Sequence, residues 1–411
     1  MHISGPISFY IVNYHHVNYY FFGDVHNAIS IDSCYLHHKE VKHDSINYCW
    51  NGVNIQSGNG WDITALLSEW LEFNNDHKIS TDFFLETSFT KDNSRKLLQL
   101  LKNKIDKRRD SSTVRLNNYM DDPINHLWLF SLQLYFYDSL ICDKTQNAYS
   151  PHVRVHYADI RLLDCDILND EEMNCNIFLI DDIFRNINIS DDKEIQTLLC
   201  IIKFLCENAE LIYSRIYLGL DPLNESIEYV HNLLNLDNST LAAQLFKRRL
   251  KNIIARGVIR DGIIIHRTAA ELNRLGGEIN NHIKNWAREK IYEYKVELLR
   301  ALNYQPVNET IEMYIINLID YLKQSSLVDM DVYTLSRMLL QNTLEVIVYA
   351  GHHHSKNYYE FFCNYLEADT LYNSDTTKDP YDNIKCIIVD KPTDYFNPYK
   401  FRQYIKEKHN M

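Results

Sequence analysis

The sequence predicts an α/β protein with a central, mainly parallel sheet, flanking helices and a large α-helical insertion. Over the first 165 residues, short apolar runs rich in aromatic and β-branched side chains alternate with segments of helical period. Residues 166–342 follow a nearly continuous helical pattern, and a β-branched run returns after them. Because strands from both ends of the chain need one shared sheet to bury their apolar faces, the helical block is expected to interrupt a single core.

The first two β-prone runs lie within the first 30 residues. They are "ISFYIVNY" and "VNYYFFG", and the polar His15 and His16 separate them, which predicts a hairpin or one long bent strand. A helix is predicted next over "WDITALLSEWLEF", where Asp62 can cap the first turn and apolar residues recur every three or four positions.

Two further strands and one helix complete the N-terminal part. The segment "KISTDFFLE" has strand character and ends on Glu86, and "HVRVHYADIR" alternates polar and apolar residues as a half-buried strand does. Between them, "TKDNSRKLLQLLKNKIDKRR" is predicted to be a helix with a leucine-rich apolar stripe.

The C-terminal part returns to strand character after long amphipathic helical segments. "LEVIVYAG" is typical of a buried strand, "HHHSKNYYEFFCNYLE" of a loop that enters a helix, and "IKCIIVD" of a last strand. We therefore expect residues 1–165 to form the N-terminal part of the α/β core, 166–342 an α-helical subdomain, and 343–411 the C-terminal part of the core.

Composition excludes several classes of function. The formal net charge of −13 argues against a nucleic-acid partner, because such binding depends on clustered lysine and arginine. The nine cysteines are scattered without Cys-x-x-Cys spacing, which indicates neither a disulfide framework nor a zinc ribbon. The N-terminus lacks the layout of a secretory signal and no segment has the roughly 20 apolar residues of a membrane span. We expect a soluble, intracellular protein, cytoplasmic or, for a viral chain, in the host cell or virion.

Polar residues follow four of the predicted strands at the point where each ends: Asp24 and His26; Glu86; Asp159 and Arg161; and His352 to His354. In open α/β sheets, ligands bind outside the carboxyl ends of the strands. If the four strands are parallel neighbours, these side chains converge at one edge. Imidazole and carboxylate are ligands for a divalent metal, and arginine can bind a carboxylate, a phosphate or a developing oxyanion.

Both histidine-bearing ends share the pattern Gly-x-x-His, from Gly23 to His26 and from Gly351 to His354. Glycine after a strand permits the backbone angles of a tight turn and the close approach of a ligand. Each feature also has an ordinary alternative, since Asp159 can pair locally with Arg161 and the three consecutive histidines can form a solvated loop.

These motifs resemble a superfamily that includes Tiki proteases, TraB-like proteins, ChaN-like haem-uptake proteins and erythromycin esterases. The matching stretches are "FFGDVH", "DFFLE", "HYADIR" and "VYAGHHHS", some two dozen residues whose order spans most of the chain. The resemblance implies an α/β core with helical insertions and water-mediated hydrolysis of a peptide or ester bond in a small-molecule or peptide substrate. In Tiki-like members it also implies a divalent metal.

The resemblance implies roles for five residues. His26, Glu86 and His354 are the expected ligands of zinc, manganese or cobalt, Asp24 the general base or a group that orients His26, and Arg161 the stabiliser of the oxyanion. In a metal-free version of the mechanism, His26 acts as the base. Asp24 is one methylene shorter than the acid that many members carry there.

Two alternatives remain open at this point. "GDVH" and "GHHH" also resemble fragments of calcineurin-like metallophosphoesterases, although the Asn-His pair and the second aspartate motif of that class are missing from the sequence. The bias toward Asn, Ile, Lys and Tyr is typical of an A/T-rich genome, so the chain could also be a catalytically inert structural or interaction protein, for example viral, that keeps the fold.

Overall fold

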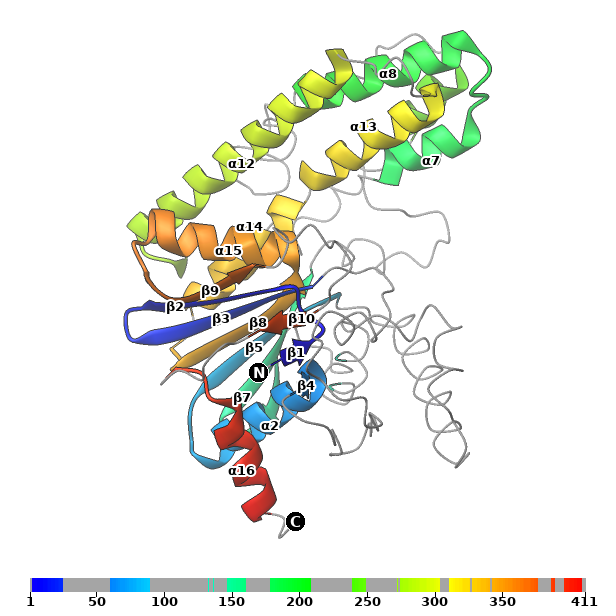
Figure 1. The fold of residues 1–411 in the computed structure, drawn as a ribbon. Coiled ribbons are helices and arrows are strands. Elements are labelled where there is room, and N and C mark those ends of the chain that lie inside the picture. The colour runs from blue at the N-terminus through cyan, green and yellow to red at the C-terminus, as the bar shows by residue number, and fades with distance from the viewer. Residues whose placement is uncertain are drawn as a thin grey trace, which may run out of the picture. The chain divides into compact units, whose positions relative to one another are not determined.

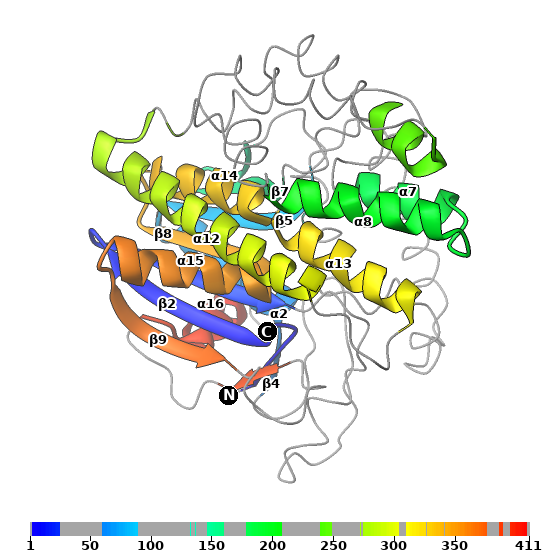
Figure 2. The same cartoon turned by 90° about the horizontal axis from the view of Figure 1, so that it is seen from above.

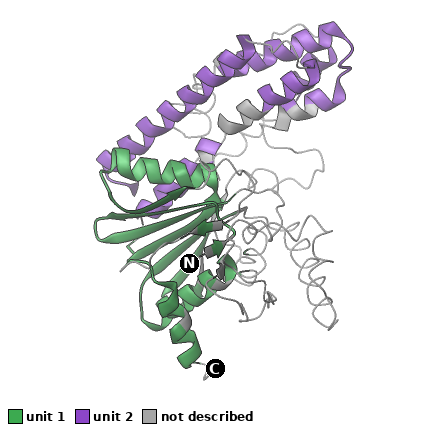
Figure 3. Cartoon of the chain, viewed as in Figure 1, with its two compact units in different colours: residues 1–159, 341–411 green, residues 160–340 purple. Residues whose placement is uncertain are grey.

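The structure is a computed structural model of the 411-residue chain. It describes residues 2–24, 60–88, 132, 136, 146–159, 178–207, 239–248, 272, 274–303, 310–325, 327–340, 342–375, 386–388 and 395–408. The chain divides into two compact units (Figure 3): unit 1 consists of residues 1–159 and 341–411, and unit 2 of residues 160–340. The predicted helix over 90–109 lies outside the described residues.

Unit 1 is built on a seven-stranded mixed sheet, which confirms the predicted α/β class (Figure 1). Its four central strands run parallel to one another, and antiparallel strands close both sides. The strand order is β6 (Gln146–Ser150), β7 (Val153–Asp159), β5 (Thr81–Ser88), β8 (Glu345–Gly351), β3 (Val17–Asp24), β2 (Ser8–Tyr14) and β9 (Asp369–Asp375). A small sheet joins β10 (Cys386–Ile388), β1 (His2–Ser4) and β4 (Gly60–Asp62).

Helices cover both faces of the large sheet. On one face, α15 (His352–Tyr365) packs over β2 and β3, and the Phe362 ring lies 4.3 Å from that of Tyr19 (Figures 1 and 2). On the other face lie α2 (Ile63–Asp76) and α16 (Pro398–Lys408), which stack Trp70 on Phe401 at 5.2 Å. The buried aromatic residues of β3 therefore pack against the helices on both faces of the sheet, because alternate residues of a strand point to opposite faces.

The loop between β2 and β3 is the tight hairpin that the sequence allowed. Tyr14 pairs with Val17, and the two residues between them, His15 and His16, have positive φ angles of 50° and 66°. Two successive positive φ values define the type I′ turn, which matches the twist of the strands and favours Asn-Gly. Histidine adopts this region at a steric cost that glycine does not have.

Replacing His15 and His16 by Asn and Gly is expected to stabilise unit 1 by about 1 kcal/mol, because it relieves two left-handed residues. Denaturant unfolding monitored by far-UV circular dichroism measures the change. The matched control is His77→Asn, since His77 lies outside the turn. A double variant no more stable than wild type would contradict the assignment of strain to this turn.

Unit 2 is helical in its described parts. It contains α7 (Phe178–Asn186), α8 (Asp192–Glu207), α12 (Gly277–Asn303), α13 (Ile311–Ser325) and α14 (Leu327–Leu340). Its hydrophobic cluster joins α7, α8, α12 and α13 to residues 242–246 through side chains such as Ile201 and Ile315. The Glu194 carboxylate accepts hydrogen bonds from the backbone amides of Leu241 and Ala242, at 2.7 and 2.8 Å, and so caps a helical turn that would otherwise have orphaned donors.

A half-buried carboxylate anchors the amino end of β8. Glu345 accepts hydrogen bonds from Trp70 Nε1 at 3.1 Å and from Asn74 Nδ2 at 2.6 Å, and thereby ties α2 to the sheet. Burial raises the pKa of the Glu345 carboxyl above its ordinary value of 4.5, because desolvation disfavours the charged form. The charge of this group is therefore a cost to the fold at neutral pH.

Glu345→Gln is expected to raise the free energy of unfolding at pH 7, because the amide oxygen still accepts both hydrogen bonds without carrying charge. A carboxyl whose folded pKa is raised stabilises the fold below its unfolded pKa and loses that contribution as pH rises through the folded pKa. The gain should therefore shrink as pH falls through the raised folded pKa, and it should be lost once pH reaches the ordinary value of 4.5. Glu345→Ala, which leaves two donors unsatisfied, should cost about 1–3 kcal/mol. A Gln variant less stable than wild type at pH 7 would contradict this account.

Candidate functional site

The carboxyl ends of the four central strands meet at one edge of the sheet, as the sequence predicted. β7, β5, β8 and β3 are parallel neighbours in that order, and Asp24 lies opposite Gly351 in register. The strands run further than expected: Glu86 and Asp24 lie within β5 and β3 rather than after them. His26 and Arg161 lie outside the described residues.

Glu86 and His354 are brought together at this edge from positions 268 residues apart in the chain. The distance from His354 Nε2 to Glu86 Oε1 is 3.7 Å, and both side chains are buried, with 3% and 5% of the residue surface exposed. The other carboxylate oxygen, Oε2, accepts a hydrogen bond from the backbone amide of Gly351. Glu86 is therefore held at the start of α15, where the helix dipole favours a negative charge.

The three consecutive histidines occupy three different environments. They form the first turn of α15, not a loop, because the helix begins at His352. His352 is buried, and its Nδ1 lies 2.8 Å from Ser8 Oγ; burial lowers the pKa of this imidazole. His353 is exposed, and His354 faces Glu86. The helical geometry thus selects His354 as the member of the trio that meets the acid on β5.

Gly23 allows the first turn of α15 to lie directly on β3. A Cβ at this position would be 2.2 Å from Ser8 Oγ and 2.9 Å from the Cα of His352. The glycine therefore accommodates the chain's own helix, while the approach of a ligand to it stays a prediction.

The second glycine of the motif has a different role from the one predicted. Gly351 has φ −55° and ψ 150°, a conformation open to any residue, so the expectation of unusual backbone angles is wrong there. Its amide instead donates to Glu86. One turn into the helix, the Ser355 hydroxyl donates to the carbonyl of Phe22 at 2.9 Å, which adds a contact to β3.

The start of α15 is thus held at three points across the sheet. His352 binds Ser8 on β2, Ser355 binds the backbone of β3, and Gly351 binds Glu86 on β5. The strand order β5-β8-β3-β2 separates the first and last of these contacts by three strand spacings.

Asp24 lies at the same end of the sheet. It is the last residue of β3, has 2% of its surface exposed, and pairs in register with Gly351. Its strand is separated from that of Glu86 by β8. Glu86 shares a face of the sheet with Gly23, so the Asp24 side chain, one residue further along β3, points to the opposite face.

The described donors fit part of a metal site. Two ligands of a tetrahedral ion with bonds of about 2.0–2.1 Å lie about 3.3 Å apart, close to the 3.7 Å between His354 Nε2 and Glu86 Oε1. Within the described ranges, no group of three histidine, cysteine or acidic side chains has the arrangement of a metal centre. The third ligand that the sequence suggests, His26, lies outside those ranges.

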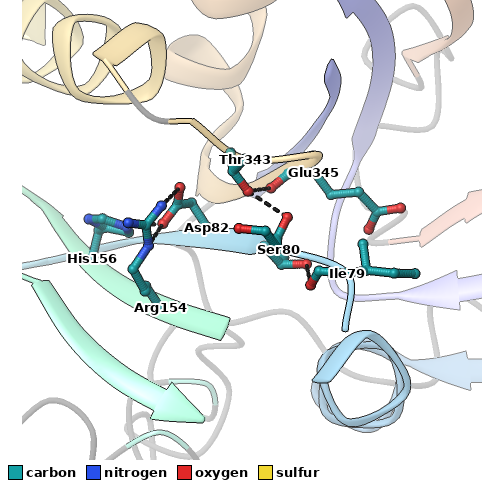
Figure 4. A network of polar contacts seen from close by, with 8 residues as sticks. Ile79, Ser80, Asp82, Arg154, His156, Thr343 and Glu345 are labelled. Carbon is teal, nitrogen blue, oxygen red and sulfur yellow. Dashed lines mark hydrogen bonds and ion pairs between the residues drawn. The ribbon is translucent and has the colours of Figure 1, made fainter. Parts of the chain in front are cut away.

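A second polar network lies on β5 and β7 and was missed by the sequence analysis (Figure 4). Asp82 is fully buried and binds Arg154 through both carboxylate oxygens, with Nε–Oδ1 at 2.7 Å and Nη2–Oδ2 at 2.6 Å. His156 Nε2 approaches Asp82 Oδ1 at 2.6 Å while its ring stacks on Phe84 at 4.3 Å. His156 is only 1% exposed. We therefore interpret this network as a structural link between β5 and β7.

A signal for this network was present in the sequence. Asp82 is an acid inside an otherwise apolar strand, and a buried carboxylate needs charged partners. Arg154 and His156 stand two apart in "HVRVHYADIR", so they share one face of β7, and Arg154 lies opposite Asp82 in register. Reading the polar positions of the two strands together would have predicted the contact.

Comparison of the chain with protein-family models, with curated proteins and with solved structures gives no match. In the part of the chain that the structure describes, no helix has the length and apolar character needed to cross a bilayer.

Gly23→Ala is expected to displace the first turn of α15, because the new methyl would meet the backbone of His352. Overpacking of this kind costs about 1–3 kcal/mol, measured by denaturant unfolding, and hydrogen exchange should rise in the first turn of α15. Gly277→Ala is the matched control, since a Cβ there has no neighbour within 4 Å. Equal stability of the two variants would contradict the close approach.

Proposed function

We propose that the protein is a hydrolase that uses water to cleave a peptide or ester bond at the carboxyl edge of the sheet, in the manner of the superfamily that its motifs resemble. The observation that carries the proposal is the buried contact between His354 and Glu86, which come from opposite ends of the chain. A buried acid and imidazole at the ligand-binding edge of a parallel sheet are typical of catalytic or metal sites.

Each described residue has a distinct task in this proposal. The Gly351 amide fixes one oxygen of Glu86, so that the other oxygen faces His354 Nε2. That pair, with His26, would hold a divalent metal such as zinc, manganese or cobalt. Such an ion supplies a water of lowered pKa.

Asp24 and Arg161 would handle the proton and the developing charge. The Asp24 carboxylate, buried at the end of β3, would accept the proton of the attacking water or orient His26. Arg161 follows the end of β7 in the chain, and its guanidinium would stabilise the oxyanion or bind a substrate carboxylate. The absence of a nucleophilic serine motif from the sequence favours water as the attacking group.

The metal content of the purified protein, measured by elemental mass spectrometry after reconstitution with zinc, manganese or cobalt, tests the proposal. We expect about one equivalent in wild type and loss of the metal in His26→Ala, His354→Ala and Glu86→Gln. The glutamine can still accept the Gly351 hydrogen bond, so its loss of metal would report on charge rather than on folding. His353→Ala is the matched control, because this neighbour is exposed and should retain the metal.

Absence of bound metal in wild type would contradict the metal-dependent form of the proposal. Hydrolysis of ester and peptide substrates by the metal-free protein would then have to be abolished by His26→Ala for the metal-free form to stand. If neither metal binding nor hydrolysis is found, the protein is an inert member of its fold.

A further inference from the structure

Strand β5 contains one residue more than its neighbour β7 at the position of Glu86. Two residues, Glu86 and Thr87, separate Leu85 from Ser88 on β5, whereas a single residue separates the partners of Leu85 and Ser88 on β7. This is the arrangement of a β-bulge, and we call Glu86 and Thr87 the β5 bulge. We propose that Thr87, the additional residue, is a positioning residue that directs the Glu86 carboxylate to the start of α15. The inference rests on the proposed function, which assigns Glu86 and His354 to the reacting site.

The β5 bulge coincides with the end of the pairing between β5 and β8. The register between these two strands runs from Thr81 to Leu85, and the partner of Leu85 is Tyr349. β8 itself continues to Gly351, where it is still paired with β3. A ladder continued on the other side would bring the main chain of β5 to Gly351, because parallel strands bond through evenly spaced main-chain groups.

The Glu86 carboxylate takes the place of that main chain. The Gly351 amide donates to Glu86 Oε2. If the register of β5 and β8 continued by two residues, Thr87 would pair with Gly351, and the amide would bond to the main-chain carbonyl of Glu86. The side chain and the main chain of Glu86 therefore compete for one donor. The bulge decides this competition, because it takes β5 out of the ladder and re-aims the side chain.

The use of the carboxylate at this amide determines where its second oxygen lies. With Oε2 bound to the Gly351 amide, Oε1 lies 3.7 Å from His354 Nε2. Gly351 directly precedes α15, so one short segment carries both the donor that fixes the acid and the imidazole that faces it. A regular β5 would bond through its main-chain carbonyl and release the carboxylate. The contact between Glu86 and His354 therefore depends on the additional residue in β5.

A second bulge, in β9, provides the matched control. Ile11 pairs with Tyr372 and the next residue of β2, Val12, pairs with Thr370, which makes Leu371 an additional residue of β9. β8, β3 and β2 lie between this strand and β5. Deletion of Leu371 therefore removes a bulge from the same sheet without touching the pairing of β5.

The first test is the scalar coupling across the hydrogen bond of the Gly351 amide, measured by NMR in deuterated, metal-free protein. In wild type, the amide nitrogen should couple to the side-chain carboxyl carbon of Glu86. Deletion of Thr87 gives β5 and β7 equal numbers of residues, and the coupling should move to the main-chain carbonyl carbon of Glu86. Deletion of Leu371 should leave the wild-type coupling unchanged.

The second test is zinc affinity, measured by isothermal titration calorimetry with zinc alone as the probe. Deletion of Thr87 should lower the affinity at least about tenfold, as for the loss of other groups that orient metal ligands. Deletion of Leu371 should keep the wild-type affinity. Denaturant unfolding of both variants compares their stability, so that a loss of affinity specific to the Thr87 deletion reports on the direction of the Glu86 carboxylate.

A variant of unchanged length covers the case in which deletion of Thr87 prevents folding. Glu86→Thr combined with Thr87→Glu keeps the composition and moves the acid by one position within the β5 bulge. This exchange should abolish the coupling between the Gly351 amide and a side-chain carboxyl carbon. Retention of that coupling would overturn the proposal.

Two other results would overturn the proposal. One is coupling of the wild-type Gly351 amide to a main-chain carbonyl carbon. The other is a folded Thr87 deletion variant that keeps both the carboxyl coupling and the wild-type zinc affinity. Failure of wild type to bind zinc would instead contradict the metal-dependent form of the proposed function, because the coupling is measured without metal and decides the positioning role separately.

Discussion

The candidate site depends on the contact between the first turn of α15 and the end of β3. Gly23 lacks the Cβ that would meet the Cα of His352, and this absence lets the helix lie on the sheet. Once the helix start is in place, the Gly351 amide reaches Glu86 and the His354 ring faces the same carboxylate. A single backbone approach thus brings together groups that are far apart in the sequence, at the edge where parallel strands offer their ligand-binding side.

Three of the acidic groups on the large sheet, Asp82, Glu345 and Glu86, differ in how their charge is balanced. Asp82 is matched by a bidentate arginine and a histidine, which makes it a link between β5 and β7. Glu345 accepts hydrogen bonds from neutral donors of α2, and burial raises its pKa. Glu86 has a backbone amide on one oxygen and an imidazole facing the other. Of the three, Glu86 is the acid on which the proposed function depends.

Sequence reasoning predicted the parallel core and the convergence of strand ends because apolar periodicity and the position of glycines are local signals. The sequence does not predict that Gly23 accommodates α15 or that the histidine trio begins that helix, because the contact between α15 and β2 joins residues more than 340 positions apart. Asp82 was missed for a related reason: its partners are identified only when the registers of two strands are read together. The sequence therefore did not predict those tertiary contacts in which an element far away in the chain determines the role of a side chain.

The central proposal is that Glu86 and His354 together bind a catalytic cation at the carboxyl edge of the sheet. The most direct measurement is an anomalous diffraction map, at the zinc absorption edge, of crystals grown with one equivalent of zinc. The account predicts one strong peak within bonding distance, about 2.0–2.2 Å, of both His354 Nε2 and Glu86 Oε1. A map in which zinc binds elsewhere while this pair keeps its direct contact would contradict the account.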